Sequence, residues 1–303
     1  MLLKDILEGL DYKGDVIQDL EIESVESDSR NVKKGSLFVA IEGFDYDGHE
    51  YITEAIKNGA ALVIVDEKNI EQGLKISKPF IVTTNTRYAL GICARNFYAD
   101  PSKNFKLIGI TGTKGKTTTS FMIKSMLEAC DKKVGLIGTI GKFIGDTKIE
   151  DSNITTPEST KLQEIFCKMR DEKVEFVIME VSSQSLKLDR VAGLEFDVGV
   201  FTNFSKDHIS KKEHLNVEDY FNSKAKLFTM CKKAFINGDD IYSDKIKKIS
   251  KCEVKTFGID NICDIMAEDI EITNSCVTFK YKTEVVELAI PGRFSVYNAL
   301  RCN

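Results

Sequence analysis

Short runs of hydrophobic residues alternate with amphipathic segments along the first part of the chain. The apolar runs predict three strands, at 37–41, 61–65 and 79–82. Helical spacing of apolar residues predicts helices at 2–10, 51–58 and 87–98. Pro101 marks the end of this unit, because proline disfavours helical backbone in the residue before it. We therefore expect a small α/β domain over residues 1–100.

The rest of the chain alternates more regularly between strand and helix. Strands are predicted at 107–111, 134–137, 176–181, 198–202, 234–236 and 254–257. Helices are predicted at 117–130, 159–170, 217–230 and 242–250. This order is typical of a doubly wound, mainly parallel sheet. After Phe257 single apolar and polar residues alternate, which predicts antiparallel hairpins over 270–290, appended to that sheet. We expect these elements to form a second domain over residues 101–303.

The composition fits two soluble domains and narrows the possible partners. Of the 303 residues, 42% are hydrophobic and 29% are charged, and this length is enough for two hydrophobic cores. The net charge of -5 gives no electrostatic argument for a nucleic-acid partner. The eight cysteines form no CxxC pair, which favours reduced thiols over disulfides or a zinc site. Charges near the N-terminus and the lack of a long apolar run predict a cytoplasmic protein with no membrane segment.

One stretch, residues 109–119 (GITGTKGKTTT), combines glycines, lysines and hydroxyls between a predicted strand and a predicted helix. This order is typical of a phosphate-binding loop, in which glycines let backbone N–H groups approach the phosphates. Lys116 would then reach the outer phosphates, and the Thr117 hydroxyl would contribute to a Mg²⁺ site. The general pattern requires glycine where this chain has Ile110. A purely structural turn is the alternative, but it leaves Gly-Lys-Thr at a helix start unexplained.

Polar residues gather where several predicted strands end, and in open parallel sheets these ends bind ligands. Glu180 ends an apolar strand, and an acid there is costly to bury unless it binds a cation, which makes Glu180 a metal candidate. The segment 153–158 either caps the next helix or binds a ligand. Taken alone, His208 is more typical of a surface histidine, and Lys224 of a solvated helix face.

Two polar turns flank a predicted strand of the first domain. They are Ser27-Asp28-Ser29-Arg30 and the segment 45–49. Asp, Ser and Gly are common in turns for structural reasons. An arginine and hydroxyls beside a strand end would also hold a phosphorylated ligand. The residues alone leave both interpretations open.

Taken together, these motifs resemble the Mur ligase family, the amide ligases of peptidoglycan synthesis and cell-wall formation, and most closely the members that extend UDP-N-acetylmuramoyl-dipeptide. The family loop GxxGTxGKT is matched over 109–117, with Lys114 where the family usually has Asn. The N-terminal domain of these ligases holds the uridine diphosphate. Its Asp-Ser-Arg turn and following strand are matched over 28–30 and 35–40. The resemblance spans nearly the whole chain.

The resemblance implies roles for three groups of residues. It implies ATP contacts by Gly112, Thr113, Lys114, Gly115, Lys116, Thr117 and Thr118. It implies contacts with the UDP-muramoyl substrate by Ser29, Arg30, Asn153, Thr155, Thr156, Ser182 and Arg190. It implies Mg²⁺ ligands at Thr117, Glu180, His208 and Lys224, with Lys224 carbamylated into a carboxylate-like group. The expected catalytic residues are Lys116, His208 and carbamylated Lys224.

Three departures from the family pattern bear on function. The chain has Gln184 where the family usually has His, and a second histidine is displaced by two residues to His214, so the roles of both stay open. Residues 291–300 resemble the start of the helix that leads to the family's third domain, and no such domain follows in this sequence. In the family that domain supplies part of the nucleotide site and selects the amino acid. We therefore expect weak activity from the chain alone.

The activity that the resemblance implies is the ATP-dependent addition of an amino acid to UDP-N-acetylmuramoyl-L-alanyl-D-glutamate, through an acyl phosphate. The amino acid would be meso-diaminopimelate or L-lysine, and we expect the chain to act as a monomer. One alternative is another Mur-type ligase, such as cyanophycin synthetase or folylpolyglutamate synthetase. The Asp28-Ser29-Arg30 turn argues against the latter, which lacks a comparable uridine-binding domain.

Two further alternatives come from other classes of protein. A generic P-loop kinase or GTPase would not need the Thr155-Thr156-Pro157 turn together with Glu180 and His208. The second alternative is a non-catalytic fragment that binds nucleotide or UDP-sugar. Phosphate release in the presence of the UDP-muramoyl substrate and the amino acid would distinguish an enzyme from such a fragment.

Overall fold

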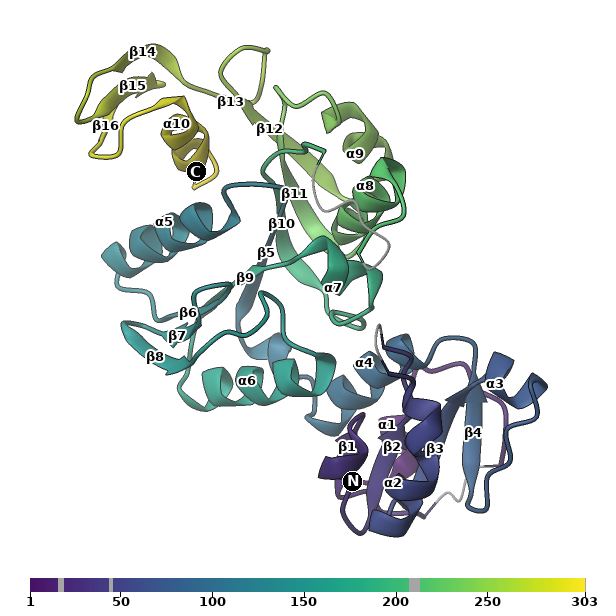
Figure 1. Ribbon diagram of the computed structural model, residues 1–303. Coiled ribbons are helices and arrows are strands. Elements are labelled where there is room, and N and C mark those ends of the chain that lie inside the picture. The colour runs from purple at the N-terminus through teal and green to yellow at the C-terminus, as the bar shows by residue number, and fades with distance from the viewer. Residues whose placement is uncertain (16–18, 44–45, 207–212, 303) are drawn as a thin grey trace. The chain divides into compact units, whose positions relative to one another are not determined.

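The computed structural model describes residues 1–15, 19–43, 46–206 and 213–302, and the chain divides into two compact units (Figure 1). The first unit consists of Met1–Lys103, Pro157–Lys168 and Leu188–Leu194. The second consists of Asn104–Thr156, Met169–Lys187 and Glu195–Asn303. The first unit thus includes two later segments that hydrophobic periodicity does not assign to it.

A four-stranded parallel sheet forms the centre of the first unit, in the order β1-β2-β3-β4. Its strands are β1 (Ser24–Glu26), β2 (Ser36–Val39), β3 (Leu62–Asp66) and β4 (Phe80–Thr83). The α-helices are α1 (Leu3–Ile6), α2 (Ile52–Asn58), α3 (Glu67–Glu71) and α4 (Thr86–Phe97), and short 3₁₀ turns are η1 (Ser29–Asn31), η2 (Gly48–Tyr51) and η3 (Pro101–Asn104). The three predicted strands are confirmed. The sequence did not predict β1, which has only three residues and one buried side chain.

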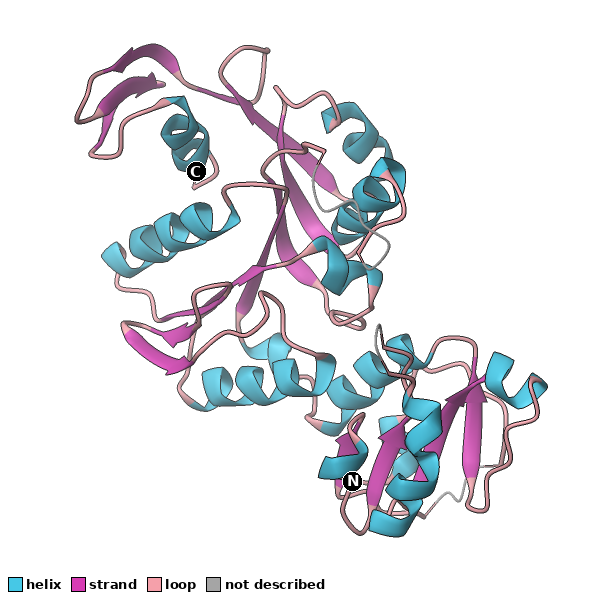
Figure 2. Cartoon of the chain, viewed as in Figure 1, coloured by secondary structure: helices cyan, strands magenta, loops and turns pink. Residues whose placement is uncertain are grey.

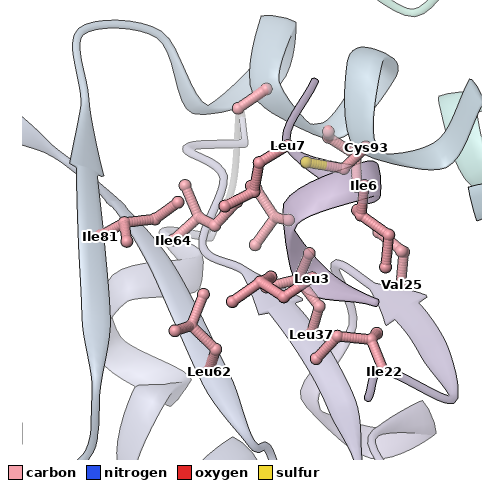
Figure 3. Close-up of a cluster of buried hydrophobic side chains, with 13 residues drawn as sticks. Leu3, Ile6, Leu7, Ile22, Val25, Leu37, Leu62, Ile64, Ile81 and Cys93 are labelled. Carbon is pink, nitrogen blue, oxygen red and sulfur yellow. The ribbon is translucent and has the colours of Figure 1, made fainter. Parts of the chain in front are cut away.

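The two faces of this sheet carry separate hydrophobic cores, because successive residues of a strand point to opposite faces. On one face, Leu37 and Leu62 pack in a cluster with Leu3 of α1 (Figure 3). On the other face, Phe38 and Val63 pack with residues of α2. The central strands β2 and β3 therefore bury apolar side chains on both faces, which is typical of a parallel sheet covered on both sides.

The second unit is built on a nine-stranded sheet, in the order β13-β12-β11-β10-β5-β9-β6-β7-β8. Its strands are β5 (Lys106–Thr111), β6 (Val134–Ile137), β7 (Lys142–Ile144), β8 (Thr147–Glu150), β9 (Phe176–Glu180), β10 (Phe196–Phe201), β11 (Cys231–Asn237), β12 (Glu253–Gly258) and β13 (Ile265–Met266). The seven strands from β13 through β6 in this order are parallel to their neighbours. At the other edge, β7 pairs antiparallel with β6, and β8 pairs antiparallel with β7. This confirms the predicted α/β class and the mainly parallel sheet.

The strand order places β5 between β9 and β10, so later strands of the chain are added on both sides of β5. The register pairs Ile110 with Glu180 and Thr111 with Phe201. The carboxyl ends of these three strands therefore lie side by side. Such a point is where open parallel sheets bind ligands.

The remaining helices of the described chain follow β5 in the sequence, and most of α6 belongs to the first unit (Figure 2). The helices are α5 (Lys116–Ala129), α6 (Ser159–Asp171), α7 (Ser183–Lys187), α8 (Val217–Ala225), the 3₁₀ helix η4 (Lys226–Thr229), α9 (Ser243–Ile249) and α10 (Arg293–Leu300). The helix predicted over 217–230 thus changes to 3₁₀ geometry after Ala225. None of the described helices is long and apolar enough to cross a membrane.

The predicted antiparallel hairpins are present as β14 (Glu268–Ile272), β15 (Val277–Tyr281) and β16 (Glu284–Leu288). They form a three-stranded sheet of their own and do not extend the large sheet. Phe279 of β15 and Val296 of α10 are buried in one cluster with Phe257 of β12. Burial of this apolar face attaches the small sheet to the second unit.

Candidate functional site

At two positions, the loop between β5 and α5 has a positive φ angle that glycine adopts more readily than other residues. Gly112 has a φ of +147° and Gly115 a φ of +84°. A Cβ at Gly112 would also lie 1.9 Å from the Thr202 hydroxyl oxygen. Ile110, where the general pattern has glycine, is fully buried within β5. The loop therefore begins only after the strand ends at Thr111. This explains why the glycine of the general phosphate-loop pattern is absent at position 110.

The loop is attached to the segment that follows β10. Thr113 N–H donates to the Asn203 carbonyl at 2.9 Å, and Lys114 N–H donates to the Asn203 side-chain oxygen at 3.0 Å. The Thr202 hydroxyl donates to the Lys114 carbonyl at 2.8 Å. These contacts use the backbone of Lys114, whose side chain is exposed, so lysine replaces asparagine here at little structural cost. Thr202 and Asn203 were missed as site residues, although a Thr-Asn pair at a strand end was a visible signal.

Two lysine side chains converge on the loop. The Lys116 ammonium donates to the Gly112 carbonyl at 3.0 Å and to the Thr113 carbonyl at 3.3 Å. The Lys224 ammonium donates to the same Gly112 carbonyl at 2.9 Å and lies 4.4 Å from the centre of the Tyr220 ring. Lys224 is only 2% exposed. The solvated position suggested by its helical spacing is therefore wrong.

Thr118 lies at the same end of α5 but faces a different environment. With Thr117 it borders an apolar pocket of about 570 Å³. Phe121 and Met122 of α5 and Phe279 of β15 contribute to the lining. The phosphate-type loop and this apolar pocket thus share the first turn of α5.

Glu180, at the end of β9, is 1% exposed and is surrounded by hydrogen-bond donors. Its Oε2 accepts from the Thr117 hydroxyl at 3.0 Å and from the Thr139 hydroxyl at 3.0 Å. Its Oε1 accepts from Thr139 N–H at 3.2 Å. A carboxylate beside hydroxyl oxygens is the type of ligand set that Mg²⁺ prefers.

The predicted metal ligands are brought together only in part. Glu180 and Thr117 are in contact, whereas Lys224 contacts the loop carbonyl described above. His208 lies outside the described residues. Within the described ranges, no three His, Cys, Asp or Glu side chains form a group that could hold a metal ion. The described oxygen donors suit Mg²⁺ and leave most of its coordination to other ligands.

The predicted substrate-binding turn over 153–156 is attached to the end of β9. The Thr156 hydroxyl donates to the Glu180 carbonyl at 2.9 Å and accepts from Ser182 N–H at 3.1 Å. The Thr155 hydroxyl oxygen lies 3.1 Å from that of Thr139. Asn153 is exposed on the same turn, and the Ser182 hydroxyl accepts from the backbone at the start of α7. Thr155, Thr156 and Ser182 thus lie at the end of β9 that carries the candidate metal carboxylate, with Asn153 on the same turn.

The other predicted substrate residues belong to the first unit. A pocket of about 600 Å³ is lined by Asp28, Ser29 and Arg30. The Arg30 guanidinium donates to both oxygens of the Asp28 carboxylate, and this contact lowers the pKa of the Asp28 carboxyl. The Ser29 hydroxyl donates to Glu54 at 2.9 Å. Arg190 forms an ion pair with Glu158 at 2.7 Å.

His214 is buried between α7 and α8. Its Nε2 lies 2.9 Å from the Ser183 hydroxyl, and its Nδ1 lies 3.5 Å from the Asp219 carboxylate. Burial lowers the pKa of this imidazole. His214 therefore links the strand end that carries Glu180 to the helix that carries Lys224.

Residues 110–302 match the Mur ligase middle domain, and residues 21–98 match the domain described as Mur ligase family, catalytic domain. The chain belongs to the Mur ligase family. Its similarity to curated members extends over nearly its whole length. It is 47% identical over 306 residues to a UDP-N-acetylmuramoyl-L-alanyl-D-glutamate–2,6-diaminopimelate ligase of Clostridium botulinum, and 42% identical over 311 residues to the ligase of the same name from Clostridioides difficile.

Solved structures of Mur ligases have the same fold. A structure of a UDP-N-acetylmuramoyl-L-alanyl-D-glutamate–2,6-diaminopimelate ligase covers 100% of this chain with a TM-score of 0.85 at 25% identity. A MurF ligase from Thermotoga maritima, solved in complex with ADP, covers 94% of the chain with a TM-score of 0.58 at 20% identity. The chain spans 62% of the length of the Clostridium botulinum and Clostridioides difficile relatives.

Proposed function

We propose that this Mur ligase chain acts in peptidoglycan synthesis, in the ATP-dependent addition of meso-diaminopimelate or L-lysine to UDP-N-acetylmuramoyl-L-alanyl-D-glutamate. The names of the relatives at 42–47% identity support this substrate class. The main support for the proposal is that the nucleotide-type loop and the substrate-type turn both form hydrogen bonds to Glu180. Thr117 of the nucleotide-type loop donates to this carboxylate, and Thr156 of the substrate-type turn donates to the backbone of the same residue.

The second unit would bind the nucleotide. Backbone N–H groups at the start of α5 and the positive end of its dipole attract phosphates. The Lys116 ammonium already lies within hydrogen-bond distance of the loop that would surround them. A MurF ligase of the same fold was solved in complex with ADP, which supports a nucleotide as a ligand of this fold. Residues 101–303 would thus form the ATP-binding domain.

A magnesium ion would be held by Thr117, Glu180, His208 and Lys224. When bound, Mg²⁺ offsets the repulsion between the triphosphate and the substrate carboxylate. Carbamylation would convert the buried ammonium of Lys224 into a carboxylate-like ligand. The position of this side chain at the Gly112 carbonyl supports a role beside the phosphates.

The first unit would hold the UDP end of the acceptor substrate, with Ser29 and Arg30 in its pocket. Asn153, Thr155, Thr156, Ser182 and Arg190 would hold the muramoyl-peptide portion. Its terminal carboxylate would attack the γ-phosphate of ATP and displace ADP, which gives an acyl phosphate. The amine of the amino acid would then attack the acyl carbon and displace phosphate, which leaves an amide bond. The residues of the chain act here by positioning and charge neutralisation.

Calorimetric titration of the chain with ADP and MgCl₂, and separately with UDP-N-acetylmuramoyl-L-alanyl-D-glutamate, tests the proposal. We expect both to bind, and we expect Lys116→Ala to weaken ADP binding more than tenfold. Lys248→Ala, at an exposed lysine of α9, is the matched control and leaves both affinities unchanged. A chain that binds neither ligand would contradict the proposal.

A further inference from the structure

Thr139 belongs to none of the motifs that the sequence singles out, yet it contacts the centre of the candidate site. It lies in the turn between β6 and β7 and is exposed. Its hydroxyl is 3.0 Å from Glu180 Oε2 and 3.1 Å from the Thr155 hydroxyl. Its backbone N–H is 3.2 Å from Glu180 Oε1. One residue therefore bonds both oxygens of the carboxylate and also reaches the substrate-type turn.

The chemistry of these groups fixes the direction of the hydrogen bonds. A carboxylate only accepts, and a hydroxyl has one hydrogen to donate. Thr139 gives its hydrogen to Glu180, so its oxygen must accept from Thr155. Thr117 donates to the same Oε2 from the nucleotide-type loop. The result is a relay in which Thr155 donates to Thr139, and Thr139 and Thr117 both donate to Glu180.

The turn is shaped to bring its backbone against the carboxylate. A Cβ on Gly138 would lie only 2.3 Å from Glu180 Oε1. The absence of a side chain at this position lets the N–H of Thr139 reach Oε1. The N–H of Gly138 donates to the Gly141 carbonyl at 3.1 Å, which closes the turn. Thr139 is therefore held in place by its own turn, independently of Thr155.

We propose that Thr139 is a positioning residue that orients Glu180 for magnesium-dependent nucleotide binding and couples this carboxylate to the acceptor substrate through Thr155. The inference rests on the function proposed above. Because the hydrogen of Thr155 is committed to Thr139, its oxygen offers a ligand only lone pairs. Thr155 therefore recognises an N–H or O–H group of the acceptor, such as a peptide amide or a sugar hydroxyl. A donor bound there strengthens the next bonds of the relay, so the two ligands favour each other's binding.

Calorimetric titrations with ADP test the proposal, with and without MgCl₂ and with and without UDP-N-acetylmuramoyl-L-alanyl-D-glutamate. Thr139→Val keeps the shape of the side chain and removes the hydroxyl. We expect it to weaken ADP binding about tenfold in the presence of Mg²⁺, to leave binding without Mg²⁺ unchanged, and to abolish the mutual enhancement of the two ligands. Thr139→Ser restores both properties. Thr147→Val, at an exposed threonine of β8, is the matched control.

The outcomes separate this inference from the proposed function. If the original chain binds both ligands and Thr139→Val keeps the same Mg²⁺ dependence and the same enhancement, the relay is wrong and the proposed function stands. Failure of Thr139→Ser to restore binding would assign Thr139 a steric role and also overturn the relay. If the original chain binds neither ligand, the proposed function and the relay both fall.

Discussion

The two units present their candidate ligand groups in opposite ways. In the first unit, the Arg30 side chain is 82% exposed and contacts Asp28 two residues away. In the second unit, Glu180 and Lys224 are 1% and 2% exposed and are held by hydroxyls and backbone from distant segments. Exposed ion pairs contribute little to stability, whereas a buried charge depends on every partner around it. Substitutions should therefore change binding alone in the first unit, and both binding and folding in the second.

The largest effect is expected from Gly112→Ala. The new Cβ would meet the Thr202 hydroxyl at 1.9 Å, in a backbone conformation that disfavours any side chain. We expect a loss of about 2–4 kcal/mol in the free energy of unfolding, measured by urea denaturation, and loss of ADP binding. Gly145→Ala is the matched control, because Gly145 has a φ of +55° and no atom within 4 Å of an added Cβ. An equal loss in both variants would show that backbone strain alone is responsible.

A smaller effect, confined to binding, is expected from Arg30→Gln in the first unit. The guanidinium would contact the diphosphate of the substrate, so its loss should weaken UDP binding about fivefold to tenfold by calorimetry. The melting temperature should not change, because the pair with Asp28 is exposed. Lys57→Gln, at an exposed lysine of α2, controls for the loss of positive charge. A lower melting temperature for Arg30→Gln would break the contrast between the two units.

The parts of the fold and site that follow from local sequence were predictable. The parallel strands β5, β9 and β10 are apolar runs, and Gly115, Lys116 and Thr117 stand together where a strand-to-helix turn is expected. Glu180 could be singled out because an acid at the end of an apolar strand needs a partner. The β7–β8 hairpin was missed, because its two strands have only three and four residues and, unlike the four-residue strands β4 and β6, form no apolar run. Short strands give too few positions for a period to be visible.

Residues that act through tertiary approach could not be predicted in this way. Thr139 reaches Glu180 only because Gly138 lets the turn come close, and Thr202 and Asn203 hold the loop from a neighbouring strand. Lys224 has the spacing of an exposed helical lysine, and it is buried because α8 packs with Tyr220 against the loop. Resemblance to a family, and not periodicity, had singled out this lysine.

The smallest expected effect is a difference in how the two units respond to acid. Burial lowers the pKa of His214 below its usual value near 6.5, so the folded chain binds this proton less tightly than the unfolded chain. The stability contributed by neutral His214 is complete above about pH 6.5 and is lost as the pH falls toward the folded pKa. Asp219 opposes this shift and Lys187 adds to it. Arg30 lowers the pKa of Asp28, so that contact is lost only below about pH 4.

Thermal unfolding between pH 5 and 8, followed with titrations of UDP-N-acetylmuramoyl-L-alanyl-D-glutamate over the same range, measures this difference. The melting temperature should fall on acidification below about pH 6.5. The substrate affinity should stay constant, because the diphosphate that Arg30 would contact is esterified at both ends and keeps its charge over this range. His214→Gln replaces the titrating ring by an amide, so its melting temperature should be lower at pH 8 but should depend less on pH. The same slope in the variant would remove His214 as the origin of the acid response. A parallel fall in the affinity for this substrate would show that the two units do not respond to acid separately.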